Sequence, residues 1–304
     1  MKQEANQKKN SKLKDYLQLI KMSLSIMVVF SAVICYLLAP KVVAYDWWMI
    51  LLLFVGGMLV TGSANAINQT VEKDTDAIMK RTATRPIAAG RMTTTEGWAF
   101  AILTGIAGVV ILGVFFNWLS AGLAAFSLFL YAFVYTPLKK ISAVSVIVGA
   151  FPGALPCLIG YAAGNDDLSL AGWVLFGIQF LWQFPHFWAI AWLAHQDYSK
   201  AGFRLLPGQG ETTKTTALQT IIYAVLLLPA CIIPYTIGLT ESNTIGGMIS
   251  LAIVIIANFF LITQCVRLYK DMTQTAARRV MFSSYIYLPI VFFALLAAKQ
   301  STGI

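Results

Sequence analysis

The sequence predicts an all-helical, polytopic membrane protein, a bundle of about nine transmembrane helices. The chain of 304 residues is 58% hydrophobic, only 12% charged, and has a mean hydropathy of +0.72. These values are typical of membrane proteins, because soluble domains carry roughly 25% charged residues. No polar stretch is long enough to form a separate soluble domain, so we expect a single domain.

Nine apolar runs are each long enough to cross a bilayer, which takes about 17–25 residues. They cover residues 17–39, 47–67, 97–117, 119–136, 143–163, 170–194, 217–238, 246–266 and 281–298. A tight turn around Asn117 joins the third run to the fourth, and the fifth run contains Pro152 and Pro156. We expect a basic N-terminal tail over 1–16, a transmembrane domain over 17–298 and a short C-terminal tail over 299–304.

The basic residues predict the orientation of the bundle. With a cytoplasmic N-terminus, the cytoplasmic loops hold most lysines and arginines, and the opposite side keeps only Lys41 and Lys299. This asymmetry follows the positive-inside rule and favours an odd number of spans, with the C-terminus on the opposite side. The net charge of +9 therefore reflects topology and attraction to anionic lipid, and no nucleic acid partner is needed to explain it.

The first residues, MKQEANQKKNSKLKDY, are rich in lysine and contain no arginine, and no small-residue cleavage site follows the first apolar run. They therefore match neither a signal peptide nor a transit peptide, which favours a prokaryotic cytoplasmic (inner) membrane. The four cysteines are isolated within apolar runs and form no CxxC pair. We expect them to be small core residues rather than disulfides or thiolate metal ligands.

Polar side chains gather at the end of the second apolar run. Asn68, Glu72 and Asp76 follow one another at intervals of four residues. On a helix they form one narrow stripe about 80° wide, and Asp74 falls outside it. Carboxylates at the end of a membrane helix are unfavourable unless they bind something, and this oxygen set suits a Mg²⁺ ion that holds a phosphate.

Two arginines follow this stripe. Pro86 biases Arg85 out of the helical conformation, so we expect the helical element to end there. Acids followed by Arg81 and Arg85 beside a turn are what a Mg²⁺-diphosphate site needs, because guanidinium groups neutralise the charge that the metal leaves. The alternative is a solvated helix end, where the arginines set the topology and the acids pair with Lys73, Lys80 and Arg81.

Two further cytoplasmic loops carry charged residues. Lys139 and Lys140, between the fourth and fifth runs, either anchor the chain at the membrane surface or reach a phosphate. Asp197, after the sixth run, precedes Lys200 by three residues. It either forms a simple pair with that lysine or faces the Asn68 stripe and gives a metal site its second wall.

His186 lies inside the sixth run, within the segment WQFPHFW. An imidazole is unfavourable in a membrane, so we expect it to face the interior of the bundle. His186 and Asp197 share nearly the same helix face but lie about 16 Å apart along the axis. His186 is either a hydrogen-bonded core residue or a ligand, whereas we expect His195, on another face, to be solvated.

The first loop resembles the N-x-x-x-D-x-x-x-D motif of the UbiA-type intramembrane prenyltransferases. Its continuation resembles the D-x-x-M-x-R-T-x-x-R-P of the branch that farnesylates haem, here formed by Asp76, Met79, Arg81, Thr82, Arg85 and Pro86. Further segments agree with that branch: YTPLKK at 135–140, GAFPGALPCLIGYAA at 149–163, WQFPHFWAIAWL at 182–193 and DYSKAGFRLLP at 197–207.

The chain departs from the family pattern at three places. Glu72 stands where the first motif usually has Asp, and it remains a sound oxygen ligand. The wider family has a second acid after Asp197, where this chain has Ala201, and the haem branch also keeps one acid there. Phe203-Arg204-Leu205 replaces a more usual Ile-Pro-Met, which leaves the shape of this loop open.

The resemblance implies transfer of the farnesyl group of farnesyl diphosphate to a vinyl group of haem b, with addition of water, giving haem O and diphosphate. It implies a Mg²⁺ ion held by Asn68, Glu72, Asp76 and Asp197, and a diphosphate held by Arg81, Arg85, Lys139, Lys140 and Lys200. It also implies a prenyl or cation pocket formed by Tyr135, Tyr161, Trp182 and Phe187, with His186 contacting haem. The implied partners are the two substrates and the lipid bilayer, with haem A synthase or oxidase assembly proteins downstream.

Two alternatives remain open at this point. The same chemistry could act on an aromatic or quinone precursor instead of haem. A transporter could also line a pathway with intramembrane Asn, Gln and His side chains. A transporter more often places ionisable residues near the middle of the bilayer in duplicated halves, whereas here the carboxylates lie at span ends and no internal repeat is visible.

Overall fold

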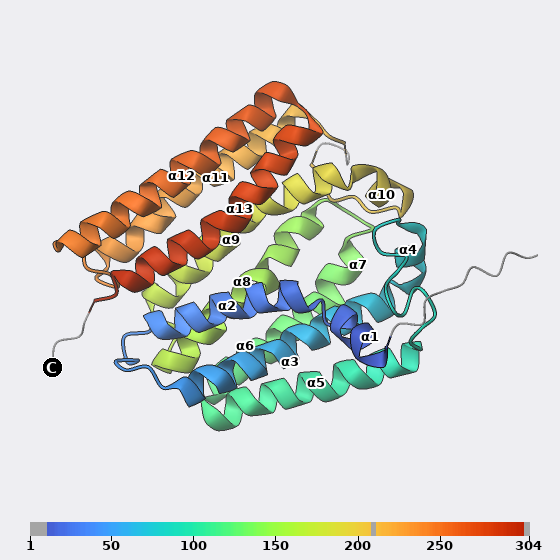
Figure 1. Ribbon diagram of the computed structural model, residues 1–304, viewed down its shortest axis with the longest axis horizontal. Helices are drawn as coiled ribbons and strands as arrows, with labels where there is room; N and C mark the ends of the chain where they lie inside the picture. Colours follow the sequence, from blue (N-terminus) through green and yellow to red (C-terminus); the bar gives the residue numbers. More distant parts are fainter. Residues whose placement is uncertain (1–10, 208–210, 301–304) are drawn as a thin grey trace, which may run out of the picture.

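The computed structural model describes residues 11–207 and 211–300, which fold into an all-helical bundle (Figure 1). Apart from one antiparallel bridge between Thr240 and Lys299, this part of the chain contains no strand. The predicted tails over 1–16 and 299–304 therefore lie partly outside the described residues. The elements are α1 Lys12–Leu19, α2 Met22–Leu38, α3 Trp47–Val71, α4 Lys73–Ile78, α5 Thr94–Phe115, α6 Trp118–Phe129, the π-helix η1 Leu130–Tyr135, α7 Thr136–Leu138, α8 Val144–Asn165, α9 Leu170–Leu193, α10 His195–Lys200, α11 Lys214–Thr236, α12 Ile245–Asp271 and α13 Gln274–Ala297.

The predicted membrane bundle is confirmed. Within the described residues, eight helical segments are long and apolar enough to cross a membrane, counting α6, η1 and α7 as one. The ninth candidate is the pair α1 and α2, which is bent by 47° at its break. The first span, predicted as one run over 17–39, is therefore interrupted at Ile20 and Lys21.

Caps fix the ends of these helices where the sequence offers short polar side chains. Thr93 and Glu96 form a reciprocal capping box at the start of α5. Asn117 makes the tight turn that joins α5 to α6, because its side chain accepts from Ser120 N at 2.8 Å and donates to Ala162 O of α8 at 2.7 Å. The predicted tight connection at Asn117 is confirmed.

The helices form two groups with α8 and α9 between them (Figure 1). One apolar core joins α9 to α11, α12 and α13, and a second joins α2, α3, α6 and α8. The four cysteines are free and buried in this packing, as predicted. Helices α1, α4, α7 and α10 gather at one end of the bundle, and α13 finishes at the opposite end (Figure 1), as an odd number of spans requires.

At that opposite end, Lys299 stabilises the end of α2. Its Nζ donates to the carbonyl oxygens of Leu37 at 2.7 Å, Ala39 at 2.9 Å and Val42 at 2.6 Å. Leu37 lies in the last turn of α2, whose carbonyl groups have no partner inside the helix, whereas Ala39 O also accepts from Val42 N at 3.0 Å. The ammonium group therefore binds the end of the helix and the turn that follows it. The chain end is thereby tied to the first span.

Glycine allows α8 to approach α2 closely. A Cβ atom on Gly160 would lie 1.9 Å from the carbonyl oxygen of Ala32, a backbone atom that cannot move away cheaply. Small residues at such crossings let membrane helices pack backbone against backbone. The close packing of α2 on α8 therefore depends on Gly160 having no side chain.

We expect Gly160→Ala to destabilise the protein by about 1–3 kcal/mol, because the added methyl group forces α2 and α8 apart. Thermal unfolding of the detergent-purified protein measures this as a lower midpoint. The matched control is Gly177→Ala in α9, where an added Cβ has no neighbour within 4 Å. Equal midpoints for both variants would show that the contact with Ala32 does not limit stability.

Candidate active site

The predicted acidic stripe crosses a helix break. Helix α3 ends at Val71 and α4 begins at Lys73, so the expectation of one continuous helix is wrong. The helical hydrogen-bond pattern nevertheless continues across the break, since Glu72 N donates to Asn68 O at 2.9 Å and Asp76 N donates to Glu72 O at 2.7 Å. Asn68, Glu72 and Asp76 therefore keep one face in common, as predicted. All three are buried, while Asp74 is exposed.

Lys139 lies between the oxygen atoms of two of these side chains. Its Nζ donates to Asn68 Oδ1 at 2.8 Å and to Glu72 Oε1 at 2.8 Å, and all three residues are buried. The Asn68 amide in turn donates to Glu72 Oε2, and Tyr131 OH donates to Asn68 Oδ1 at 3.1 Å. A buried ammonium group with these partners forms a charge-assisted network rather than a surface anchor.

The π-helix η1 precedes Lys139 and carries the two tyrosines that surround it. Its wider turn is a rare distortion that is frequent at functional sites. It brings the rings of Tyr131 and Tyr135 to 5.2 Å from each other, and Lys139 Nζ lies 4.5 Å from the centre of the Tyr135 ring. Lys140 is exposed to solvent. The structure thus separates two lysines that the sequence could not distinguish.

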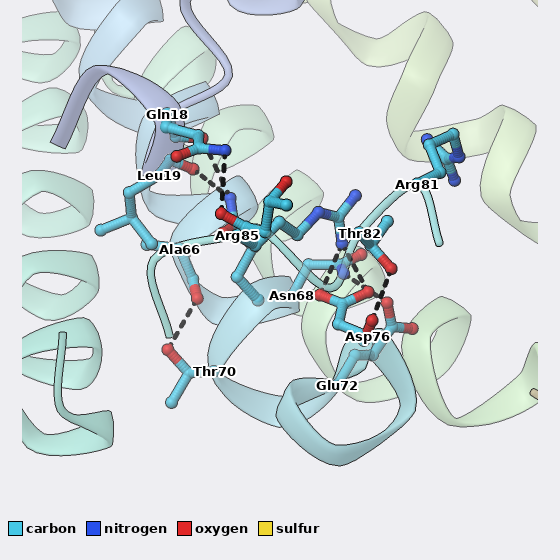
Figure 2. Close-up of polar contacts among 12 residues, drawn as sticks. Gln18, Leu19, Ala66, Asn68, Thr70, Glu72, Asp76, Arg81, Thr82 and Arg85 are labelled. Carbon is cyan, nitrogen blue, oxygen red and sulfur yellow. Dashed lines mark hydrogen bonds and ion pairs between the residues drawn. The ribbon is translucent and has the colours of Figure 1, made fainter. Parts of the chain in front are cut away.

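Asp76 binds the second predicted arginine. Both of its carboxylate oxygens accept from Arg85 Nη1, at 2.7 and 2.6 Å, and Figure 2 shows this contact beside Glu72 and Asn68. Asp76 is fully buried, and this burial raises the pKa of its carboxyl group, which the Arg85 guanidinium opposes. Helix α4 already ends at Ile78, so the expectation that the helical element runs to Arg85 is wrong.

The third predicted loop packs against the turn after α4. Asp197 Oδ2 accepts from Arg81 N at 3.4 Å, and Arg81 Nη2 donates to Tyr198 OH at 3.1 Å. Arg204 N donates to Lys139 O at 3.0 Å, which links the same loop to α7. The three loops therefore meet, as the sequence predicted. Lys200 is exposed, and among the described residues Asp197 contacts Arg81 rather than Lys200.

The buried oxygen atoms suit a hard cation in their chemistry. Asn68, Glu72 and Asp76 supply amide and carboxylate oxygens, which are the ligands of Mg²⁺. Each carboxylate contacts a basic side chain, and within the described residues no three His, Cys, Asp or Glu side chains stand close enough to hold a metal together. A divalent cation at this site would therefore replace Lys139 and Arg85 as the partners of the acids.

The aromatic residues predicted for the pocket lie in different places. Tyr135 borders the Lys139 network. Trp182 and Phe187 surround His186, deeper in the bundle, with the Trp182 ring stacked on the imidazole at 4.7 Å. Tyr161 lies away from the Lys139 network, near the C-terminal end of α8, where its hydroxyl group binds Ser169 at the start of α9. His186 is buried against α13, as predicted for a residue that faces the interior.

The sequence interpretation missed three polar residues around the site. Tyr131 supports Asn68, as described above. Asn65 and Gln69 are buried on another face of α3, where they bind the break between α1 and α2. Two amides at an interval of four residues inside an apolar run were the available signal, because such groups need partners in a membrane.

A helical membrane bundle that buries acids and basic residues where three loops meet has the architecture of an intramembrane prenyltransferase. The UbiA prenyltransferase family matches residues 28–286, and the chain belongs to this family. It is 40% identical over 289 residues to the protoheme IX farnesyltransferase of Cytophaga hutchinsonii, covering 95% of this chain and 99% of that relative. It is also 40% identical to the protein of that name from Flavobacterium johnsoniae, over 91% of each chain.

Solved structures share the fold. A digeranylgeranylglyceryl phosphate synthase superposes with a TM-score of 0.75 at 22% identity, covering 94% of this chain and 98% of that one. A UbiA homologue from Archaeoglobus fulgidus bound to GPP and Mg²⁺ gives a TM-score of 0.68 at 12% identity, covering 92% and 99%. The predicted family resemblance is confirmed, and the chain is a prenyl-transferring membrane enzyme rather than a transporter.

Proposed function

We propose that this enzyme transfers the farnesyl group of farnesyl diphosphate to a vinyl group of haem b, with addition of water, and releases haem O and diphosphate. The observation that carries the choice of acceptor is the 40% identity to a protoheme IX farnesyltransferase over nearly the whole of both chains. The buried cluster of acids, amide and basic side chains supports the diphosphate half of the reaction.

Breaking the allylic C–O bond requires that negative charge on the departing diphosphate be neutralised. Mg²⁺ held by Asn68, Glu72, Asp76 and Asp197 would neutralise part of this negative charge. Lys139 and Arg85 neutralise much of the remainder, because their side chains already bind Glu72 and Asp76 and can donate to phosphate oxygens. Arg81 assists, since its backbone amide contacts Asp197 and, within the described residues, its guanidinium group contacts no carboxylate. Lys140 and Lys200 are exposed and act, in this proposal, only at the outer edge of the site.

The organic half of the reaction needs an apolar and aromatic surrounding. A farnesyl chain buried among the spans contributes up to roughly 10 kcal/mol of binding, at about 0.8 kcal/mol per carbon. Tyr135 presents its ring beside Lys139, where the allylic cation would form, and a ring face stabilises such a cation. The electron-rich vinyl group attacks this cation, and water then quenches the charge that passes to the acceptor.

The experiment that tests the proposal incubates the purified protein with haem b, farnesyl diphosphate and Mg²⁺ and follows the products by mass spectrometry. The expected result is haem O together with an equivalent amount of diphosphate. A parallel reaction with 4-hydroxybenzoate tests the aromatic acceptor. Prenylation of that compound, with haem b left unchanged, would contradict the proposed acceptor while keeping the family chemistry.

We propose further that His186 contacts the haem iron. Its Nδ1 lies 2.8 Å from Ser284 Oγ, and Ser284 Oγ donates its one proton to Met281 O at 2.7 Å. Ser284 must then accept from His186, so the ring proton is on Nδ1 and Nε2 keeps a lone pair. Neutral imidazole with a free nitrogen is the usual protein ligand of haem iron.

His186→Ala should weaken haem b binding and shift the Soret absorption band, while the affinity for farnesyl diphosphate stays within about twofold, because the diphosphate residues are separate from the imidazole. Absorption titration with haem b and a competition assay with farnesyl diphosphate measure the two affinities. The matched control is Ser284→Ala, which keeps the imidazole. Unchanged haem binding with only a loss of stability would make His186 a core residue.

We propose that the protein lies in a prokaryotic cytoplasmic membrane with α4 and α10 on the cytoplasmic side. Asp74 is exposed at that end and Asp166 at the other. In intact cells, an impermeant maleimide should label Asp166→Cys, and it should label Asp74→Cys only after permeabilisation. The native cysteines are buried, so the unaltered protein serves as the control. Labelling of Asp74→Cys in intact cells would refute this orientation.

A further inference from the structure

The bend between α1 and α2 is held in a strained conformation by side chains of α3. Lys21 sits at the bend with φ 48° and ψ 59°, a left-handed conformation that is unfavourable for a lysine. Gln69 Nε2 donates to Leu19 O at 2.7 Å, and Asn65 Nδ2 donates to Ile20 O at 3.1 Å. Ser25 Oγ also donates to Ile20 O at 2.7 Å. Strain fixed by several buried groups is a feature of functional sites.

A basic cavity of about 810 Å³ opens between this bend and the turn that follows α4. Its charged lining is entirely cationic: Lys14, Lys21, Arg81, Arg85 and Arg91. Arg85 is neutralised by Asp76, and Arg91 by Asp15 at 2.8 Å. Within the described residues, Lys14, Lys21 and the guanidinium group of Arg81 contact no carboxylate. These three basic groups therefore have no carboxylate partner in the described part of the chain, and the cavity suits an anionic group.

This anionic group differs from the diphosphate in its surroundings. Arg81 and Arg85, which the proposed function places at the diphosphate, line the cavity, but none of Asn68, Glu72, Asp76 and Lys139 does, so the oxygen atoms suited to a metal lie elsewhere. Arg85 lines the cavity and binds Asp76, and Figure 2 shows it reaching from the α1 side toward that carboxylate. A ligand in the cavity is therefore separated from the acid cluster by one arginine side chain, as an acceptor substrate needs to be.

Apolar side chains also line the cavity. Leu17 is 39% exposed and Leu24 is 52% exposed, and Met22 lines the cavity as well. These cations beside exposed leucines fit an amphiphile that carries acidic groups on an apolar body. Haem b is such a molecule, because its two propionates project from one edge of an apolar ring and its vinyl groups lie elsewhere on the ring.

We propose that this cavity binds the propionate groups of the haem acceptor, with Lys21 as the principal carboxylate partner. The proposal rests on the proposed function and adds the anchor that orients the acceptor. Charge-assisted hydrogen bonds from lysine and arginine fix the propionate edge, and the bend held by Asn65 and Gln69 keeps the lysine in place. The haem ring then extends from the cavity past Arg85 toward the site of prenyl transfer.

The test compares haem b with haem b dimethyl ester, whose carboxyl groups carry no charge, using protein in phosphatidylcholine nanodiscs. The unaltered enzyme should have a KM at least about tenfold lower for haem b than for the ester. Lys21→Met should remove most of this difference by weakening haem b alone, with the KM for farnesyl diphosphate within about twofold. Lys21→Gly should do the same while relieving the backbone strain, so that a failure to fold cannot explain the loss.

Lys80→Met is the matched control, because Lys80 is exposed and does not line the cavity. Two outcomes would overturn the proposal. An increase in the KM for farnesyl diphosphate alone would assign the cavity to the donor. The second outcome is that Lys21→Met still discriminates between haem b and its ester, but its activity no longer rises when phosphatidylglycerol is added to the nanodiscs. That result would assign the cavity to a lipid headgroup. Failure of the proposed function is distinguishable, since the unaltered enzyme would then convert neither haem b nor its ester.

Discussion

Asp76→Asn should reduce turnover by about 10²–10³-fold, the loss typical of removing one electrostatic contact to a developing charge. Asp76 is fully buried and binds Arg85 with both oxygens, so it both neutralises and positions that arginine. The amide keeps the shape of the side chain and one acceptor for Arg85. Release of diphosphate from farnesyl diphosphate at saturating Mg²⁺ measures the effect.

Asp74→Asn is the control, because it makes the same change two residues away on an exposed side chain. We expect its turnover to stay within about twofold of the unaltered enzyme, since an exposed charge is screened by solvent. Gel filtration of both variants checks that they fold. Equal losses in the two variants would mean that acidity of the segment, rather than the buried position of Asp76, supports catalysis.

Lys139→Gln should also reduce turnover by about 10²-fold or more, because it removes the ammonium group that lies closest to Asn68 and Glu72. Glutamine can still donate a hydrogen bond to Glu72, which limits the destabilisation caused by leaving a buried carboxylate without a partner. The turnover number and the KM for farnesyl diphosphate are the quantities to measure, and both are expected to worsen.

Lys140→Gln provides the comparison, because the two lysines are adjacent in sequence but only Lys139 is buried. This variant should retain activity within about twofold of the unaltered enzyme. If Lys140→Gln lost as much activity as Lys139→Gln, burial beside Asn68 and Glu72 would not explain the importance of Lys139.

The sequence predicted the parts of the structure that depend on periodicity and hydropathy. The spans follow from apolar length, and the shared face of Asn68, Glu72 and Asp76 follows from an interval of four residues. The meeting of three loops also followed, since all three lie at span ends on one side. These features were predictable because they do not depend on the exact backbone geometry.

Features that depend on a local backbone irregularity were not predictable. The interruption at Glu72, the π-helix before Lys139 and the left-handed Lys21 are such irregularities. They are stabilised by tertiary partners such as Asn65 and Gln69, whose contacts join residues far apart in the sequence. Propensity along the chain contains no information about such partners.

The basic cavity could not be predicted from the sequence either. Its cations come from two segments more than fifty residues apart, and the sequence alone assigns them to membrane topology. Only the structure shows which arginines are neutralised, as Arg91 is by Asp15, and which cations are left without a carboxylate.

In the proposed mechanism, Glu72 and Asp76 hold a divalent cation and the diphosphate group together. The most direct measurement is the anomalous diffraction signal of Mn²⁺ in crystals grown with Mn²⁺ and a non-cleavable thio analogue of farnesyl diphosphate. We predict a Mn²⁺ peak bounded by the oxygen atoms of Asn68, Glu72 and Asp76, with Lys139 and Arg85 turned to the phosphate oxygens. A bound diphosphate with its Mn²⁺ peak away from Glu72 and Asp76, and with both ion pairs intact, would show that these acids do not bind the metal.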